Sequence, residues 1–366
     1  MKLKTNRDAV QEEALNEALK HKRCGLAISM GVGKTRIALN HIIKNYNSLL
    51  NVLVVVPKKS VMQSWLDEMD KMKLRLEDHI TFVTYLSLNK KNPEDYDIVY
   101  LDECHSLLKS HLKFLNKFNG QILGLTGTPP ENTNSEKYYM VNKFCPMVYK
   151  FSVDDATNSK ILNDYKIVVH YLNLSSSKNK KQKKRDGSFW MTSEQDNYNY
   201  YTRKVAEAQN SKSKSFASIM RMRALMDYKT KETYTKNLIK SIDSKCIIFA
   251  NTQAQADRIC KHSFHSTNSS SVENLELFSD GRIDKLSCVL QLSEGVTIPN
   301  LEEGIIMHSY GNERKASQRI GRLLRLNPEK TATCHILCYK NTVDEQWVQN
   351  SLKNFDSNKI KYIHRV

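Results

Sequence analysis

A glycine-containing turn between a short apolar run and a helical stretch constrains the fold of this chain most strongly. Residues 25–28 are apolar, residues 29–35 read Ser-Met-Gly-Val-Gly-Lys-Thr, and residues 36–46 have helical character. The glycines let backbone N–H groups point at one anion, and the start of a helix adds its positive dipole end. The pattern predicts a strand, a phosphate-binding turn and a helix. The alternative is a glycine turn that carries an ordinary surface lysine.

The residues of this turn have predicted roles in binding a nucleoside triphosphate. Lys34 would reach the β- and γ-phosphates, and the Thr35 hydroxyl would hold Mg²⁺. The rest of the predicted phosphate cradle is Met30, Gly31, Val32 and Gly33. Ile28 stands where the first glycine of the G-x-x-x-x-G-K-[ST] pattern belongs, so the turn needs support from other motifs.

Short apolar runs alternate with helical stretches along most of the chain. In the first half the further runs are 52–56, 80–84, 97–101 and 121–126, and the further helices are 8–21 and 60–71. In the second half the runs are 245–250, 286–291, 304–307 and 331–339, and the helices are 253–262, 316–324 and 343–352. Strands that are apolar on both faces and alternate with helices imply a parallel sheet covered on both sides. We therefore predict an α/β fold with two similar units.

Length and composition divide the chain into three regions. The 366 residues suit two domains of ordinary size, which we place at 1–150 and 243–366. The connecting region 151–242 contains a strand at 166–174, which we assign to the second domain, and helices near 194–209 and 213–227. Residues 178–185 hold six Lys or Arg, and we expect a mobile loop. This loop is either a solvated surface or a phosphate-backbone contact with aromatic neighbours.

Charge and cysteine usage indicate the kind of partner and compartment. The chain has 56 Lys and Arg against 39 Asp and Glu, and the net charge of +17 favours a polyanionic partner. Its eight cysteines form no C-x-x-C pair, which predicts reduced thiols and no zinc site. No apolar run approaches the roughly 18 residues that span a bilayer, and no signal peptide begins the sequence. We expect a soluble cytoplasmic protein without a membrane partner.

Three further stretches carry candidate chemistry. The apolar run 98–101 ends in Asp102 and Glu103, which could complete the magnesium coordination and activate a water, although an acidic pair at a strand end also arises by chance. A second run ends in Thr-Gly-Thr-Pro, where Thr126 and Thr128 could bond those carboxylates. Residues 318–325 read Gln-Arg-Ile-Gly-Arg-Leu-Leu-Arg. On a helix Gln318, Arg322 and Arg325 would share one face, either as an exposed basic surface or as arginines inserted into a cleft.

Together these motifs resemble those of superfamily 2 helicases and translocases. MGVGKT, DECH, TGTP, LSEGVTIP at 292–299 and QRIGRLLR match motifs I, II, III, V and VI in order and spacing. By analogy, residues 54–59 resemble motif Ia and residues 248–252 resemble motif IV. The resemblance is nearer to phage branch-migration helicases, excision-repair helicases and restriction-enzyme motor subunits than to DEAD-box RNA helicases. Besides Ile28, two residues depart from the pattern. Arg7 is displaced by one residue from the arginine that often precedes the adenine-reading glutamine in this superfamily, and Thr297 stands where many members carry Asp.

The resemblance implies two tandem RecA-like domains with ATP in the interdomain cleft. Nucleotide-binding residues would be Gln11, which looks like the adenine-reading glutamine, the turn 30–35 and Gly295. Catalytic residues would be Lys34, Asp102, Glu103, Gln318, Arg322 and Arg325, with Mg²⁺ on Thr35 and Asp102. Nucleic acid would cross both domains and touch Lys58, Lys59, Thr84, Asn251, Thr252 and Ser293.

The resulting hypothesis is an ATP- and Mg²⁺-dependent DNA helicase or translocase. It would act on single-stranded, duplex or branched DNA in replication, recombination or repair. Its small size, its Lys- and Asn-rich composition and its lack of appended domains suggest that a phage encodes it and that it works in the host cytoplasm. Two alternatives stay open: an RNA helicase, and a nucleotide-dependent nucleic-acid-binding protein without turnover. No motif indicates a protein partner.

Overall fold

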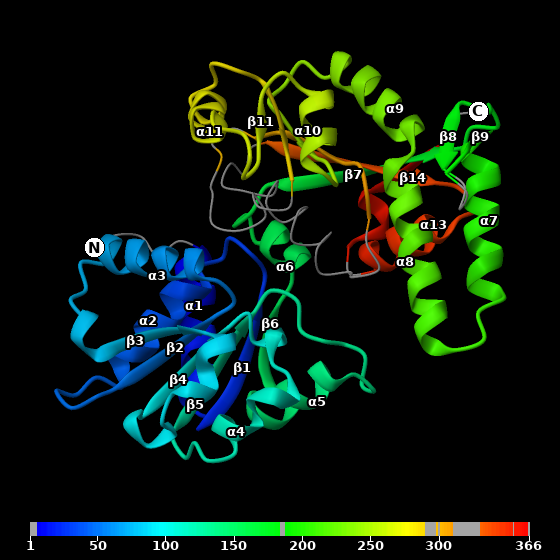
Figure 1. Ribbon diagram of the computed structural model, residues 1–366. Coiled ribbons are helices and arrows are strands. Elements are labelled where there is room, and N and C mark those ends of the chain that lie inside the picture. Colours follow the sequence, from blue (N-terminus) through cyan, green and yellow to red (C-terminus); the bar gives the residue numbers. More distant parts are fainter. Residues whose placement is uncertain are drawn as a thin grey trace. The chain divides into compact units, whose positions relative to one another are not determined.

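The computed structural model describes residues 6–183, 187–289, 298, 301–309, 330–353 and 355–364. The chain forms two compact units, and among the described residues the first comprises 6–164 and Lys330. The second contains most of the described residues from Tyr165 on. Each unit has its own sheet (Figure 1). Each also has its own hydrophobic core.

The first unit is a six-stranded sheet in the order β3-β2-β4-β5-β1-β6, and all its neighbouring strands are parallel. The strands are β1 (Arg23–Ile28), β2 (Val52–Val56), β3 (Ile80–Thr84), β4 (Ile98–Asp102), β5 (Gln121–Thr126) and β6 (Met147–Phe151). The helices are α1 (Asn6–Leu19), α2 (Lys34–Lys44), α3 (Lys59–Lys71), α4 (Leu112–Leu115), α5 (Glu136–Phe144) and α6 (Val153–Asn158). Residues 29–35, the predicted phosphate-binding turn, are called the phosphate turn below. Parallel strands end at the same edge of a sheet, so β1, β4 and β5 bring this turn, Asp102 and Thr126 to one edge.

Both faces of this first sheet are buried by helices. Leu101 of β4 packs in a cluster with Phe114 of α4 and Phe144 of α5. Its neighbour Tyr100 packs edge-on against Trp65 of α3, with ring centroids 6.1 Å apart. Successive side chains of a strand point to opposite faces, so α3 lies on one side of β4, and α4 and α5 lie on the other. This arrangement explains why residues 98–101 are apolar throughout.

The second unit has a seven-stranded sheet in the order β11-β12-β10-β13-β14-β7-β15. Its strands are β7 (Asp164–Leu172), β10 (Cys246–Phe249), β11 (Ser263–Phe264), β12 (Lys285–Cys288), β13 (Glu303–Ile306), β14 (Thr331–Tyr339) and β15 (Ile360–His364). Its helices include α7 (Glu194–Ala206), α8 (Ser211–Asp227), α9 (Lys229–Lys240), α10 (Gln253–Ile259), α11 (Ser271–Ser279) and α13 (Val343–Leu352). The predicted α/β class with two sheets flanked by helices is confirmed. The helix predicted at 316–324 lies outside the described residues.

The basic run is not a plain loop, which corrects the sequence-based expectation. Strand β8 (Lys180–Lys183) pairs antiparallel with β9 (Phe189–Thr192). The ammonium group of Lys181 lies 4.2 Å from the centroid of the Phe189 ring, and Lys180 forms a 2.9 Å ion pair with Asp227 of α8. Cross-strand pairing and these two partners offset the like charges that led us to expect a loop.

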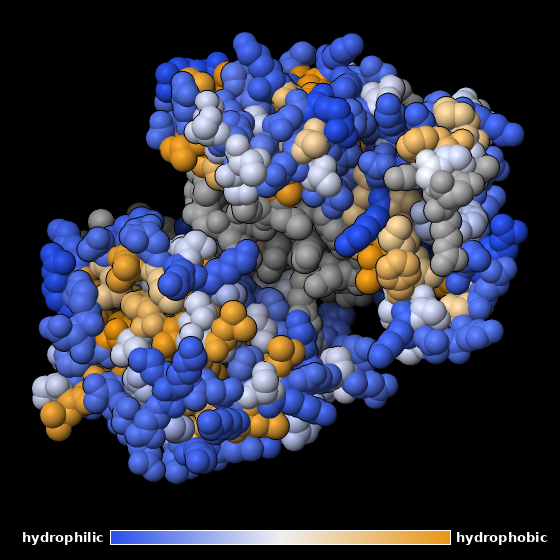
Figure 2. All heavy atoms as spheres, viewed as in Figure 1, coloured by the Kyte–Doolittle hydropathy of each residue, from blue (hydrophilic) through white to orange (hydrophobic). Residues whose placement is uncertain are grey.

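Exposed apolar side chains gather near this hairpin and its neighbouring helices. Figure 2 shows hydrophobic residues among hydrophilic ones in the region of α7 and α8. Phe189, Trp190 and Met191 of β9 and Phe216 of α8 are each exposed. A separate finding concerns membranes: none of the helices in the described residues is long and apolar enough to cross one.

Candidate nucleotide-binding site

The phosphate turn has a backbone that requires its glycines. Strand β1 ends at Ile28, and α2 begins at Lys34. Gly31 and Gly33 have φ angles of +88° and +103°, in the left-handed region that side chains disfavour. A side chain at Gly33 would also collide with the Gln11 amide. Ile28 is fully buried at the end of β1, so its side chain belongs to the core.

Lys34 lies between the turn and the acidic strand end. Its ammonium group donates a 3.3 Å hydrogen bond to the Ile28 carbonyl and lies 3.8 Å from Glu103 Oε1. A side chain at Gly127 would come within 3.4 Å of the same ammonium group. The Lys34 ammonium group therefore joins the end of β1 to Glu103, and it lies beside Gly127 of the Thr-Gly-Thr-Pro turn.

Asp102 is a buried carboxylate at the end of β4. Its Oδ2 accepts a 2.9 Å hydrogen bond from the Trp65 indole N–H, and its backbone carbonyl accepts one of 2.9 Å from the Tyr85 hydroxyl. Burial, followed by the negative charge of Glu103, raises the pKa of Asp102 to about 6, while the Trp65 bond and Lys34 oppose that rise. A buried carboxylate with raised pKa gains from a nearby cation, which favours the ionised form.

Glu103 has a backbone that other residues must hold in place. Its φ of +49° is left-handed, an uncommon conformation for a residue with a side chain. Its Oε2 accepts a long 3.4 Å hydrogen bond from the Thr126 hydroxyl and lies 3.3 Å from His105 Nδ1. The same Thr126 hydroxyl is 2.9 Å from His105 Nδ1 and accepts the Thr128 backbone N–H at 3.1 Å. The structure therefore connects Glu103 to the Thr-Gly-Thr-Pro turn.

Two hydroxyl groups near the turn have no hydrogen-bond partner among the described residues. Ser29 Oγ belongs to the phosphate turn and is buried, and Thr128 Oγ1 follows β5. Buried polar groups normally have partners, so each is suited to bind a ligand or an ordered water. These hydroxyls, the turn amides and Asp102 make a donor and acceptor set that fits a polyphosphate with a magnesium ion.

Gln11 contacts the turn itself. Its side-chain amide donates a 2.7 Å hydrogen bond to the Val32 carbonyl. Beside it lies a pocket of about 420 Å³, lined by residues of α1 and α2 and by Met72, which follows α3. Its polar lining includes Asp8, Arg36 and Asn40. A pocket with these donors and acceptors next to the phosphate turn could hold a nucleobase.

The remaining predicted residues lie in three places. Lys58 precedes α3 and Lys59 begins it, and Thr84 ends β3, at the same edge of the first sheet. Asn251 and Thr252 precede α10 in the second unit. Five residues lie outside the described part of the chain: Gly295, Ser293, Gln318, Arg322 and Arg325.

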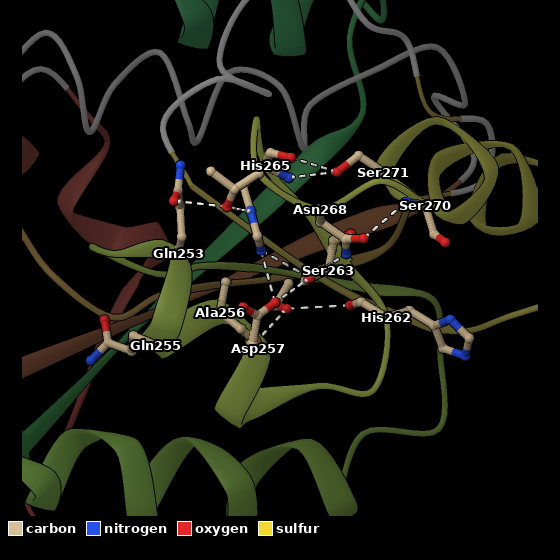
Figure 3. Close-up of polar contacts among 12 residues, drawn as sticks. Gln253, Gln255, Ala256, Asp257, His262, Ser263, His265, Asn268, Ser270 and Ser271 are labelled. Atoms are coloured by element: carbon tan, nitrogen blue, oxygen red, sulfur yellow. Dashed lines mark hydrogen bonds and ion pairs between the residues drawn. The ribbon is translucent and has the colours of Figure 1, made fainter.

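A polar network joins α10 to β11 and the residues that follow β11 in the second unit (Figure 3). Asp257 Oδ1 accepts a 2.6 Å hydrogen bond from the Ser263 hydroxyl and lies 2.8 Å from His265 Nε2. The His265 bond, followed by the Ser263 bond, lowers the pKa of the Asp257 carboxyl. Thr252 caps the helix by accepting the Gln255 N–H at 3.2 Å. The network ties α10 to β11 and so fixes the segment that Thr252 begins.

Comparisons with known proteins agree with these motifs. The family model of the type III restriction enzyme res subunit matches residues 4–131, and that of the helicase conserved C-terminal domain matches residues 230–327. The DNA 3'-5' translocase XPB2 of Sulfurisphaera tokodaii is 24% identical in an alignment of 370 positions. That alignment covers 91% of this chain and 82% of the translocase. The chain belongs to the superfamily 2 helicases and translocases. It is therefore an enzyme, an ATPase of the helicase class.

Other relatives resemble this helicase over different extents. A putative ATP-dependent RNA helicase, QP509L of African swine fever virus, is 30% identical over 127 residues, covering 28% of this chain and 24% of the viral protein. The DNA-bound type ISP restriction-modification enzyme LlaBIII has a TM-score of 0.62 at 15% identity. All of this helicase aligns with it, but only 31% of LlaBIII is covered.

Two further solved structures share the fold of this helicase. A putative HsdR subunit of a type I restriction enzyme from Vibrio vulnificus has a TM-score of 0.63 at 17% identity, covering 97% of this chain and 68% of that one. The Hef helicase domain of Pyrococcus furiosus has a TM-score of 0.51 at 15% identity, covering 96% and 100%. These likenesses confirm tandem RecA-like units.

Some residues of the site in this helicase were not predicted from the sequence. Trp65 and Tyr85 contact Asp102, and His105 contacts Glu103 and Thr126. His105 belongs to the DECH stretch and was visible there, but no role was assigned to it. Trp65 gave no such signal, because an apolar residue in a helix is usually a core residue.

Proposed function

We propose that this helicase-family enzyme is an ATP-dependent DNA helicase or translocase. The observation that supports ATP hydrolysis is the position of the Lys34 ammonium group, which lies 3.3 Å from the Ile28 carbonyl at the start of the phosphate turn and 3.8 Å from Glu103. DNA is favoured because the relative named as a DNA translocase aligns with 91% of the chain, whereas the relative named as an RNA helicase aligns with 28%. Single-stranded, duplex and branched DNA are all candidate substrates, in replication, recombination or repair.

The first unit is proposed to bind ATP with Mg²⁺. The turn from Met30 to Thr35 would hold the phosphates and Gln11 the adenine, while Thr35 and Asp102 would hold the metal. When bound, Mg²⁺ would neutralise phosphate charge. Glu103 would orient the attacking water and accept its proton, and Thr126 would transmit the state of that carboxylate through Thr128.

The second unit is proposed to complete the reaction. Gln318, Arg322 and Arg325 would act on the γ-phosphate, and Gly295 would contact the nucleotide. Six residues of the two units would touch the backbone of the nucleic acid: Lys58, Lys59, Thr84, Asn251, Thr252 and Ser293. These contacts would bind phosphates and would not depend on the base sequence. The proposed domains are 1–150 and 243–366, with 151–242 connecting them.

The test is a measurement of ATP hydrolysis without nucleic acid and with single-stranded DNA, duplex DNA, forked DNA, four-way DNA or RNA. Stimulation by DNA is expected. Stimulation by RNA alone would favour the RNA helicase alternative, and hydrolysis that no nucleic acid stimulates would contradict a motor. ATP binding without any hydrolysis would favour the binding protein without turnover. A phage origin stays a prediction that the genomic neighbourhood of the gene would test.

The β8–β9 hairpin is proposed to contact the phosphate backbone. Replacing the basic residues of 178–185 with serine, except Lys180, should flatten the salt dependence of DNA binding, since the slope falls by about 0.9 for each duplex phosphate that the protein no longer neutralises. Lys180 is kept because its ion pair with Asp227 ties the hairpin to α8. The replaced residues are Lys178, Lys181, Lys183, Lys184 and Arg185. The measurement is the DNA dissociation constant over a range of salt concentrations.

A second variant controls for net charge. It replaces five exposed lysines of the first unit with serine: Lys71, Lys73, Lys90, Lys113 and Lys117. This control should keep the wild-type slope. Equal slopes for the wild type and the hairpin variant would assign the hairpin to solvated surface.

A further inference from the structure

One tryptophan contacts a residue of the proposed metal site. The indole N–H of Trp65 donates to Asp102 Oδ2 at 2.9 Å, and the Trp65 side chain is fully buried. Its ring packs edge-on against Phe82, with centroids 6.3 Å apart, and against Tyr100, with centroids 6.1 Å apart. An indole that is enclosed in this way keeps its N–H in one place.

The hydrogen bond between Trp65 and Asp102 can orient the carboxylate because of the chemistry of its two partners. Indole N–H is a donor only and stays neutral, so it can hold a carboxylate oxygen without competing with a cation for charge. Asp102 is buried, and a free carboxylate would have two equivalent oxygens and a broad torsion. The Trp65 indole bonds Oδ2, and the Glu103 backbone N–H also bonds the carboxylate. An ionised carboxylate can accept about four hydrogen bonds or metal contacts, so it retains acceptor sites for another ligand.

We infer that Trp65 is a positioning residue, which fixes the Asp102 carboxylate so that it can bind the magnesium ion of the ATP site. This inference rests on the proposed function. Residues that orient a metal ligand by a hydrogen bond to it typically contribute about 10–100-fold to metal affinity. Trp65 lies in α3, and Asp102 ends β4. The contact therefore also connects the proposed metal site to α3, the helix that follows Lys58 and begins at Lys59.

The test compares Trp65→Phe with the wild-type protein. Phenylalanine keeps a ring in the cluster but lacks the N–H. We expect the Mg²⁺ concentration that gives half-maximal binding of a fluorescent ADP analogue to rise by about 10–100-fold. Binding of the analogue in EDTA should be unchanged, because the phosphate turn and Gln11 are untouched. A general packing defect would instead weaken binding under both conditions.

Tyr100→Phe is the matched control. It removes another buried hydrogen bond of the same aromatic cluster, the 2.7 Å contact between the Tyr100 hydroxyl and His41, and leaves the Asp102 carboxylate bonded. This variant should retain the wild-type Mg²⁺ dependence. An unchanged Mg²⁺ dependence in Trp65→Phe, with the wild type binding nucleotide in a Mg²⁺-dependent way, would overturn the inference alone. A wild type without Mg²⁺-dependent nucleotide binding would overturn the proposed function.

A measurement on the wild-type side chain covers the case in which Trp65→Phe does not fold. The chain has three tryptophans, and the Trp65 indole N–H resonance can be assigned with Trp190→Phe and Trp347→Phe. We expect this resonance to shift when Mg²⁺ is added to the ADP-bound protein. The same position with and without Mg²⁺ would overturn the inference.

Discussion

A Glu103→Gln variant is expected to bind ATP as the wild type does and to hydrolyse it about 10²–10⁴-fold more slowly, the usual contribution of a general base. The amide keeps the size of the side chain and can still accept the Thr126 hydroxyl, but it cannot take a proton from water. Lys34 stays near the turn through its bond to the Ile28 carbonyl. The measurements are steady-state ATP hydrolysis with saturating DNA and equilibrium binding of a fluorescent ATP analogue.

Glu94→Gln is the control for this substitution, because Glu94 is an exposed residue of the same unit. It should hydrolyse ATP at the wild-type rate. Turnover by Glu103→Gln within a factor of about two of the wild type would remove Glu103 as the base, since general bases contribute far more. Loss of ATP binding in that variant would instead assign Glu103 a role in holding the site together.

An Arg322→Ala variant is expected to lose about 10³–10⁵-fold in DNA-stimulated hydrolysis, the range for an arginine that stabilises phosphoryl transfer. In the first unit Lys34 faces two carboxylates, Asp102 and Glu103, so charge developing on the γ-phosphate calls for additional cations. Binding of ATP should be kept, since the phosphate turn is intact. Hydrolysis under single-turnover conditions measures the chemical step directly.

Arg282→Ala is the matched control, because Arg282 is exposed and pairs with Asp280 at 3.0 Å. It should leave hydrolysis unchanged. Arg325→Ala should behave like Arg322→Ala if both side chains reach the γ-phosphate. A wild-type chemical step in both variants would show that the second unit does not supply the catalytic arginines.

Much of the fold was predictable because its signals are local. Residues 52–56 and 98–101 are apolar because helices cover both faces of the sheet, and such runs mark buried parallel strands. Gly31 and Gly33 were recognisable because a phosphate-binding turn needs backbone angles that residues with side chains disfavour. The phosphate turn and the acidic pair were predicted to meet because parallel strands end at one edge of a sheet.

Other features depend on contacts between distant segments. Composition predicted a loop for residues 178–185, but pairing with Phe189–Thr192 turned half of it into strand β8. Lys231 of α9 is fully buried, which its sequence neighbours do not suggest. It is accommodated because Asp344, 113 residues later, forms a 2.6 Å ion pair with it.

The sequence by itself determined the family and the two α/β units, and it named the residues of the proposed ATP site. Each of these follows from short motifs whose chemistry is set by their own residues. Only the tertiary structure decided how the first unit holds the acidic pair: Trp65 bonds Asp102 across 37 residues, and Thr126 bonds Glu103 across 23. The physical reason is that a hydrogen bond depends on the final positions of donor and acceptor, which the packing of α3 and β5 around β4 sets.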